Sequence, residues 1–129
     1  MLLLIQNKIM IKNLPEFKAL IIRYETITIE EIEQHDMQIQ KLTGFGSPFS
    51  CTLCVAVDKL FGNNNCKYCV YYASTKRQMS CFKGINRKTY DGIDNHEEND
   101  YKANELLTAY RNRAKHMRSI LKKLNIEMP

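Results

Sequence analysis

Two pairs of cysteines constrain this 129-residue chain more than any other feature of its sequence. Each pair is a C-x-x-C motif, and eleven residues separate the two motifs. The four cysteines are Cys51, Cys54, Cys66 and Cys69. A C-x-x-C pair can turn both sulfurs toward one point, so two pairs supply the four thiolates of a tetrahedral zinc site. The spacing predicts a small zinc-knuckle module in residues 46–90, with little regular structure, because that segment is too short to build its own core.

Other uses of the cysteines stay open. Zinc is favoured over disulfides because the apolar start of the chain, residues 1–5, is too short for a secretory signal peptide. An iron–sulfur cluster could use the same four ligands, and a redox dithiol is a further alternative. Cys81 lies twelve residues beyond Cys69 and is a reserve ligand that could replace one of the four. The other interpretation of Cys81 is a buried thiol that binds no metal.

We expect the zinc to be structural rather than catalytic. Four thiolates leave no coordination position open for water, which a catalytic zinc needs. The zinc deaminases combine H-x-E with P-C-x-x-C, and no proline precedes Cys51 or Cys66 here. The H-E-x-x-H pattern of the zincins is absent. The three histidines fit no ligand spacing. We therefore expect a protein that is not an enzyme and that takes no small-molecule substrate.

Apolar periodicity predicts two short helices in the N-terminal region, residues 1–45. The first covers residues 13–24, with Pro15 near its first turn, and its apolar side chains have the spacing of one helix face. That face consists of Phe17, Leu20, Ile21 and Tyr24. Thr28 and Glu31 have the spacing of a capping box, which predicts a second helix over residues 29–42. Two alternatives stay open for the N-terminus: a strand over residues 2–11, or a true start at Met10 preceded by a poorly ordered or misassigned leader.

The C-terminal region, residues 91–129, joins a polar segment to the strongest helical pattern in the chain. Residues 91–100 are acidic and contain Asp91-Gly92, which predicts a linker with a turn. Over residues 100–125, apolar residues recur on one side of a long helix. That side consists of Ala103, Leu106, Leu107, Tyr110, Ala114, Met117, Leu121 and Leu124. The fold class is therefore mostly α with a zinc-knuckle module, and we expect one compact domain because so short a chain has little room for two cores.

Positive charge is concentrated in two places, residues 51–90, where seven Lys and Arg face Asp58 alone, and this long helix. The chain carries 19 Lys and Arg against 14 Asp and Glu, a formal net charge of +5. Arg111, Lys115, Arg118 and Lys122 are spaced i, i+4, i+7 and i+11, which places four cations in one line along the helix. Such a line could follow a phosphate backbone, so these four are candidate nucleic-acid contacts. The alternative is a surface helix whose cations favour its negative C-terminal end.

Several motifs together resemble a group of small phage- or prophage-encoded proteins of Bacteroidota. They are Pro15-Glu-Phe-Lys-Ala-Leu20, Tyr24-Glu-Thr-Ile-Thr28 with Ile29-Glu-Glu-Ile32, Leu42-Thr-Gly-Phe-Gly46, the two C-x-x-C motifs, Cys81 and Tyr110-Arg-Asn-Arg-Ala-Lys-His116. The resemblance spans residues 14–124. It implies a phage accessory protein that holds zinc through its cysteine pairs, with Cys81 part of the recurring pattern.

We therefore expect a zinc-stabilised accessory protein that binds RNA or DNA through its basic surfaces. The alternative is a protein that inhibits host machinery such as an RNA-guided nuclease, because small phage accessory proteins, anti-CRISPR proteins among them, often act as inhibitors. No apolar run approaches the roughly 18 residues of a membrane span, so we expect no membrane partner and a cytoplasmic location in a bacterial host.

Overall fold

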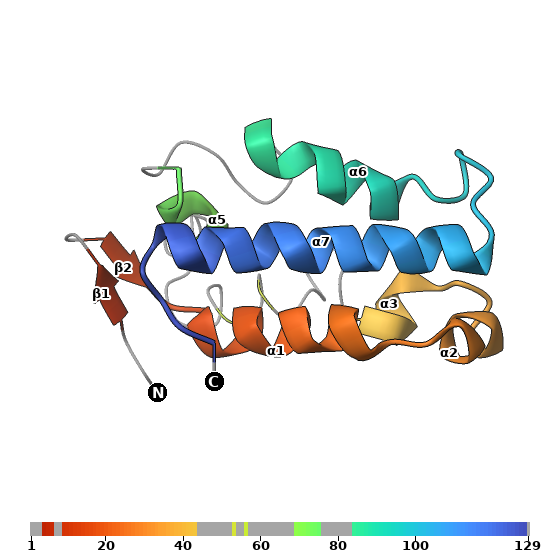
Figure 1. Cartoon of the computed structure of the whole chain (residues 1–129), viewed down its shortest axis with the longest axis horizontal. Helices are drawn as coiled ribbons and strands as arrows, with labels where there is room; N and C mark the ends of the chain where they lie inside the picture. The colour runs from red at the N-terminus through yellow and green to blue at the C-terminus, as the bar shows by residue number, and fades with distance from the viewer. Residues whose placement is uncertain are drawn as a thin grey trace.

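A computed structural model of the chain describes residues 4–6, 9–43, 53, 56, 69–75 and 84–128. These residues are mostly helical (Figure 1), which confirms the predicted fold class at this level. The elements are β1 (Leu4–Gln6), β2 (Ile9–Ile11), α1 (Leu14–Thr26), α2 (Ile29–Gln34), α3 (Ile39–Thr43), α5 (Val70–Ala73), the 3-10 turn η2 (Gly84–Asn86), α6 (Arg87–Asp94) and α7 (Ala103–Lys123). Most of the predicted zinc-knuckle module lies outside the described residues.

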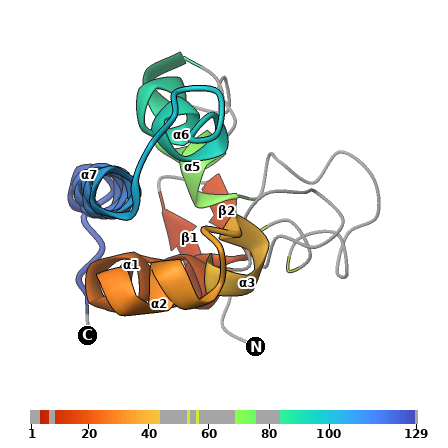
Figure 2. The same cartoon turned by 90° about the vertical axis from the view of Figure 1, so that its right-hand side faces the viewer.

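The long helix α7 is the centre of the fold. It contacts α1 on one side and α6 on the other (Figures 1 and 2). Six members of its predicted apolar side are buried, and Ala103 and Leu107 are partly buried against the same core. The six are Leu106, Tyr110, Ala114, Met117, Leu121 and Leu124. The helix and its buried face are therefore confirmed.

Helix α1 supplies the facing half of the core. Its four predicted apolar residues, from Phe17 to Tyr24, are all buried, and Pro15 lies in the first turn as expected. The rings of Tyr24 and Tyr110 stack with their centroids 5.4 Å apart, which joins α1 to α7. Phe17 meets the ring of Tyr71, from α5, edge to face at 5.1 Å. Aromatic contacts of this kind add to the hydrophobic stabilisation of the core.

The prediction of a single helix over residues 29–42 is wrong, because the chain leaves the helix after α2. The capping box at its start is confirmed, since Thr28 accepts from the amide of Glu31 and the Glu31 carboxylate accepts from the amide of Thr28. At the end, Asp36 has a left-handed φ of 51°, and the amide of Met37 donates to the carbonyl of Ile32. This Schellman ending turns the chain toward α3 although no glycine stands there.

The acidic segment that begins at Asp91 is only partly a linker, so that prediction needs correction. Asp91 and Gly92 lie inside α6 rather than in a turn, and turns begin only at Asn95. Asp91 pairs with Arg87 one helical turn earlier, at 3.1 Å. A Cβ atom at Gly92 would lie 3.7 Å from the Cβ of Ala109 on α7. Position 92 therefore faces α7 at ordinary van der Waals distance.

Residues 4–6 and 9–11 form a small two-stranded sheet. Of the two alternatives predicted for the N-terminus, the strand agrees better with the structure, because β1 and β2 pair as antiparallel strands with Ile5 opposite Met10. Among the helices of the described residues, none combines the length and the apolar character that a membrane span requires.

Candidate metal centre and basic surface

The structure describes one of the proposed zinc ligands, Cys69, which directly precedes α5. Cys51, Cys54, Cys66 and the reserve ligand Cys81 lie outside the described residues. Within the described part of the chain, no cluster of three or more His, Cys, Asp or Glu side chains could hold a metal ion. The ligand set therefore stays a prediction, and its support must come from the contacts of Cys69 and of Leu53, which lies inside the first motif.

These two residues meet at the side chain of Asn13, which is completely buried just before α1. The Nδ2 atom of Asn13 donates to Cys69 Sγ at 3.1 Å and to the carbonyl oxygen of Leu53 at 3.3 Å. Its Oδ1 atom accepts from the backbone amide of Val70 at 3.0 Å. One amide group thus binds both cysteine motifs at once.

The shared nitrogen brings the two motifs close together. The Leu53 carbonyl and the Cys69 sulfur are no farther apart than the sum of their distances from Asn13 Nδ2. Leu53 is also buried, with 3% of its surface exposed. A site with ligands from both motifs requires this proximity, and the geometry at Asn13 fits such a site.

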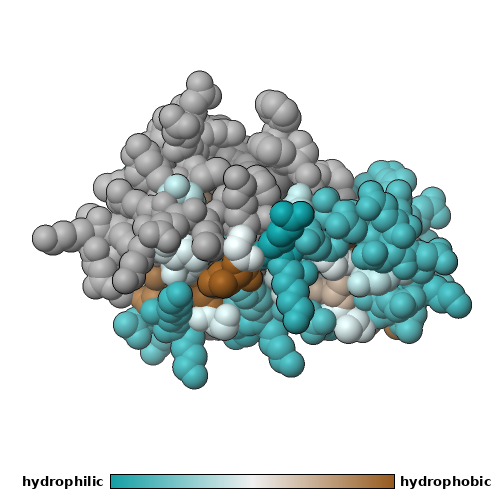
Figure 3. All heavy atoms as spheres, turned by 90° about the horizontal axis from the view of Figure 1, so that it is seen from above, coloured by the Kyte–Doolittle hydropathy of each residue, from teal (hydrophilic) through white to brown (hydrophobic). Residues whose placement is uncertain are grey.

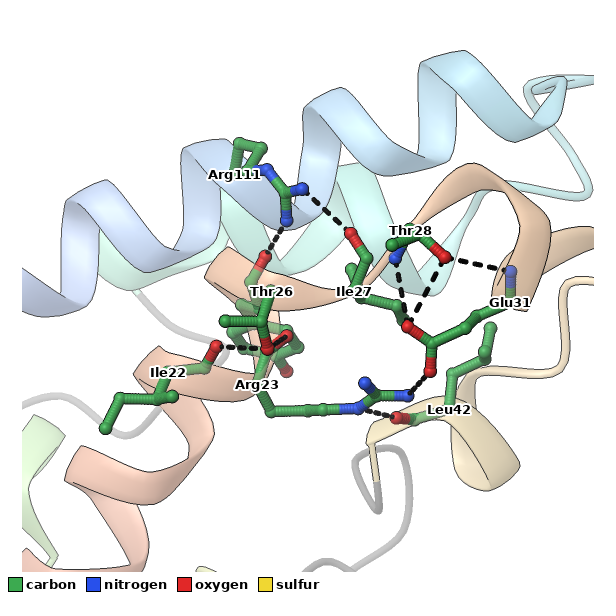
Figure 4. Close-up of polar contacts among 9 residues, drawn as sticks. Ile22, Arg23, Thr26, Ile27, Thr28, Glu31, Leu42 and Arg111 are labelled. Atoms are coloured by element: carbon green, nitrogen blue, oxygen red, sulfur yellow. Dashed lines mark hydrogen bonds and ion pairs between the residues drawn. The ribbon is translucent and has the colours of Figure 1, made fainter.

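Two of the four candidate nucleic-acid contacts bind α1. Arg111 donates from Nη1 to the carbonyl of Tyr24 and from Nη2 to the carbonyl of Ile27, at 2.5 and 2.8 Å (Figure 4). These carbonyls lie at the C-terminal end of α1, where helix carbonyls lack partners within the helix. Arg111 is therefore half-buried and caps the end of α1 from a neighbouring helix.

Arg118 also reaches α1, where it forms a bidentate ion pair with Glu25. The hydrogen bond from Arg118 lowers the pKa of Glu25, and the reciprocal bond raises the pKa of Arg118. About half of the Arg118 side chain, 47%, stays exposed. Solvent therefore screens this pair, and part of the guanidinium can still meet a ligand.

The other two candidates face solvent. Lys115 and Lys122 are exposed, and neither side chain has an ion pair or hydrogen bond within the described part of the chain. Lys123 is exposed beside them. The predicted line of four cations thus divides into two arginines that hold α1 and two lysines that face solvent.

The buried cation of α7, Arg113, was not predicted from the sequence. Arg113 is completely buried and donates from Nη1 to the carbonyl of Asn86 and to Thr89 Oγ1, both at 2.8 Å. Its guanidinium lies 4.6 Å from the centre of the Tyr71 ring. His116 Nε2 lies 2.8 Å from Asn86 Oδ1. A signal was present, because position 113 follows Tyr110 by three residues and precedes Met117 by four, on the apolar face.

Opposite charges gather at the two ends of the described structure. The α2 segment, the connection from α6 to α7 and the start of α7 lie at one end (Figure 1), and hydrophilic residues cover that end in Figure 3. Seven carboxylates are exposed on α2, on the turn after it, at the last residue of α6 and on this connection: Glu30, Glu33, Asp36, Asp94, Glu97, Glu98 and Asp100. A shallow hollow lined by Glu33, Asp36, Met37 and Ala103 shows that α2 and α7 meet there. The exposed cations of α7 lie in its other half, toward Lys123.

No family model matches the chain, and no curated protein or solved structure matches it either. Its function must therefore be argued from its own residues.

Proposed function

We propose that this chain is a non-enzymatic, zinc-stabilised protein that binds RNA or DNA through the exposed cations of α7. One observation carries the proposal: Lys115, Arg118, Lys122 and Lys123 are exposed along the last turns of α7. No Asp or Glu occurs between Leu106 and Asn125. A phosphate backbone could therefore approach this surface without meeting a carboxylate of the same helix.

The spacing of the two free lysines suits a nucleic-acid strand. Lys115 and Lys122 are seven residues apart, which corresponds to about 10 Å along a helix axis. A duplex strand advances about 3.4 Å per nucleotide, so the two ammonium groups would reach phosphates about three nucleotides apart. Contacts of this kind give affinity without base preference.

The zinc part of the proposal rests on the donor set and on Asn13. Four thiolates are the ligands that structural zinc prefers, and the buried Asn13 amide contacts both motifs. When bound, the metal would supply cross-links in place of a hydrophobic core. The proposal also includes a phage or prophage origin and a site of action in the bacterial cytoplasm, which the motif resemblance supports.

The test is salt-dependent binding of the zinc-loaded chain to labelled single- and double-stranded probes. For wild type, log K should fall linearly with log salt concentration. In Lys122→Ala the magnitude of this negative slope should fall by about one, and in Lys115→Ala/Lys122→Ala by about two. Lys41→Ala removes the same charge from an exposed position on α3 and serves as the control. The proposal would be overturned if wild type did not bind at moderate salt, or if Lys41→Ala reduced the salt slope as much as Lys122→Ala does.

The acidic end favours a second candidate, a protein that inhibits host machinery. Its exposed carboxylates are complementary to a basic protein surface, such as the groove in which an RNA-guided nuclease holds nucleic acid. A pull-down from host lysate, with and without nuclease treatment, separates the candidates. A protein partner that survives nuclease treatment and is lost in Glu97→Lys/Glu98→Lys would support inhibition. Partners that disappear with the nucleic acid would support the first proposal.

A further inference from the structure

Asn13 is a polar residue whose complete burial is not explained by its position at the start of α1. It occupies the position before α1 where an Asn side chain usually caps the helix, yet its side chain makes no such cap bond. Its three hydrogen bonds reach residues 40, 56 and 57 positions away. The side chain therefore serves a long-range contact instead of its own helix.

The partners use most of the hydrogen-bonding capacity of the amide. The two Nδ2 donors have two acceptors, a backbone carbonyl and a sulfur, and Oδ1 accepts one backbone amide. The position is completely buried, so any lost bond would leave a polar group without water. Of the partners, the sulfur is the unusual one, because a neutral thiol is only a weak acceptor.

A metal-bound thiolate is a much better acceptor than a thiol, because it carries negative charge. Groups that donate to metal ligands orient them and tune the metal, and their loss commonly weakens binding by about 10–100-fold. An N–H donor 3.1 Å from Cys69 Sγ has the position of such an outer group. Its second bond, to Leu53, would fix the first motif relative to the second.

We propose that Asn13 is a positioning residue of the metal centre, which holds Cys69 by an N–H···S hydrogen bond and ties it to the first motif through Leu53. This inference rests on the proposed zinc site. It assigns a role in metal binding to a residue outside the cysteine segment, 38 positions before Cys51. The interaction adds no ligand to the metal, and it acts on the charge and orientation of a ligand already present.

The experiment measures metal binding by the purified full-length chain. Affinity for Zn²⁺ is obtained by competition with a chelator, and Co²⁺ reports the thiolates through sulfur-to-metal charge-transfer absorption. Asn13→Asp keeps the size of the side chain but removes the N–H donors, and Asn13→Leu removes all hydrogen bonding. Both should bind Zn²⁺ about 10–100-fold more weakly and shift the Co²⁺ absorption. The same substitutions at Asn104, exposed on α7, should change neither quantity.

The outcomes separate the two proposals. If wild type binds neither metal through thiolates, the zinc site itself is wrong. If wild type binds but both Asn13 variants match it in affinity and absorption, the site stands and the role of Asn13 is wrong. Should the variants fail to fold, wild type loaded with NMR-active cadmium gives the answer. Scalar coupling between the metal and an Asn13 side-chain proton, through the hydrogen bond to sulfur, would support the proposal, and its absence would overturn it.

Discussion

Helix α7 meets its two neighbours by different chemistry. Toward α1, apolar side chains pack together, with Tyr110 stacked on Tyr24, and Arg111 and Arg118 bind at the C-terminal end of that helix. Toward α6 and the preceding turn, the fully buried guanidinium of Arg113 donates to the Asn86 carbonyl and to Thr89 Oγ1. The same helix thus buries its apolar side on one neighbour and a hydrogen-bonded cation on the other.

This difference raises the question of which cations of α7 bind within the protein and which face solvent. Five cations lie between residues 111 and 122 of α7, together with a histidine. Three of them, the arginines at 111, 113 and 118, bind groups of the protein itself, and the two lysines face solvent. The planar guanidinium suits fixed carbonyl and carboxylate partners better than an ammonium group does. In this helix the lysines are therefore the better candidates for an external partner.

The largest effect should come from the apolar contact with α1. Tyr110→Ala removes a completely buried ring and leaves a cavity, so the free energy of unfolding should fall by about 3–5 kcal/mol. Tyr110→Phe is the matched control. Burial raises the pKa of Tyr110, and its hydroxyl has no hydrogen-bond partner among the described residues, so the loss of that group should cost little or should stabilise. Urea denaturation measures both. A large loss in the Phe variant would show that the contact is not mainly apolar.

A smaller effect should come from the buried cation. Arg113→Met keeps most of the volume but leaves the Asn86 carbonyl and the Thr89 hydroxyl without their donor, which should cost about 1–3 kcal/mol. Arg113→Lys keeps the charge and should recover only part of the loss, because one ammonium group cannot reproduce the guanidinium fork. Denaturation of the two variants gives both values. If Arg113→Met were more stable than wild type, the polar contact would be tolerated rather than stabilising.

The sequence predicts the apolar contact because periodicity reports it directly. The face of α1 and the face of α7 each follow the helical repeat, and the Thr28 capping box marks a helix start. The end of α2 was not predicted because no glycine marks it, and Asp36 takes the left-handed position that glycine usually occupies. Helix α6 was not predicted because Asp91-Gly92 is a common turn dipeptide, whereas here both residues lie inside a helix that packs on α7.

The candidate sites are less accessible to sequence reasoning. Cysteine spacing predicts a metal ligand set, but Asn13 has no local signal, since its partners Leu53 and Cys69 lie 40 and 56 residues away. For the same reason, spacing places four cations on one line without showing which of them bind α1. Such partners depend on tertiary packing, which a local pattern does not contain.

The contact with α6 should respond to pH near neutrality. Burial lowers the pKa of His116, and the neighbouring Arg113 lowers it further. The unfolded chain therefore binds a proton more readily than the folded one below pH 6.5, the ordinary histidine value, and stability should fall as pH decreases from 6.5 toward the folded pKa. His116→Gln should flatten this dependence. His35→Gln, on an exposed turn, is the control, and an equal flattening there would contradict the assignment.

The stability contributed by the contact with α1 should change with pH in a more acidic range. This is the smallest of the predicted effects. Arg118 lowers the pKa of Glu25, so the stabilisation from their ion pair is present above pH 4.5 and is lost as pH falls through the lowered folded value. Glu25→Gln should therefore be slightly less stable than wild type at pH 7, and the difference should vanish in acid and shrink in high salt, because the pair is exposed. Denaturation at several pH values measures the difference in unfolding free energy between wild type and Glu25→Gln. A loss comparable to that of Tyr110→Ala would mean that charge, rather than the apolar core, holds α1 against α7.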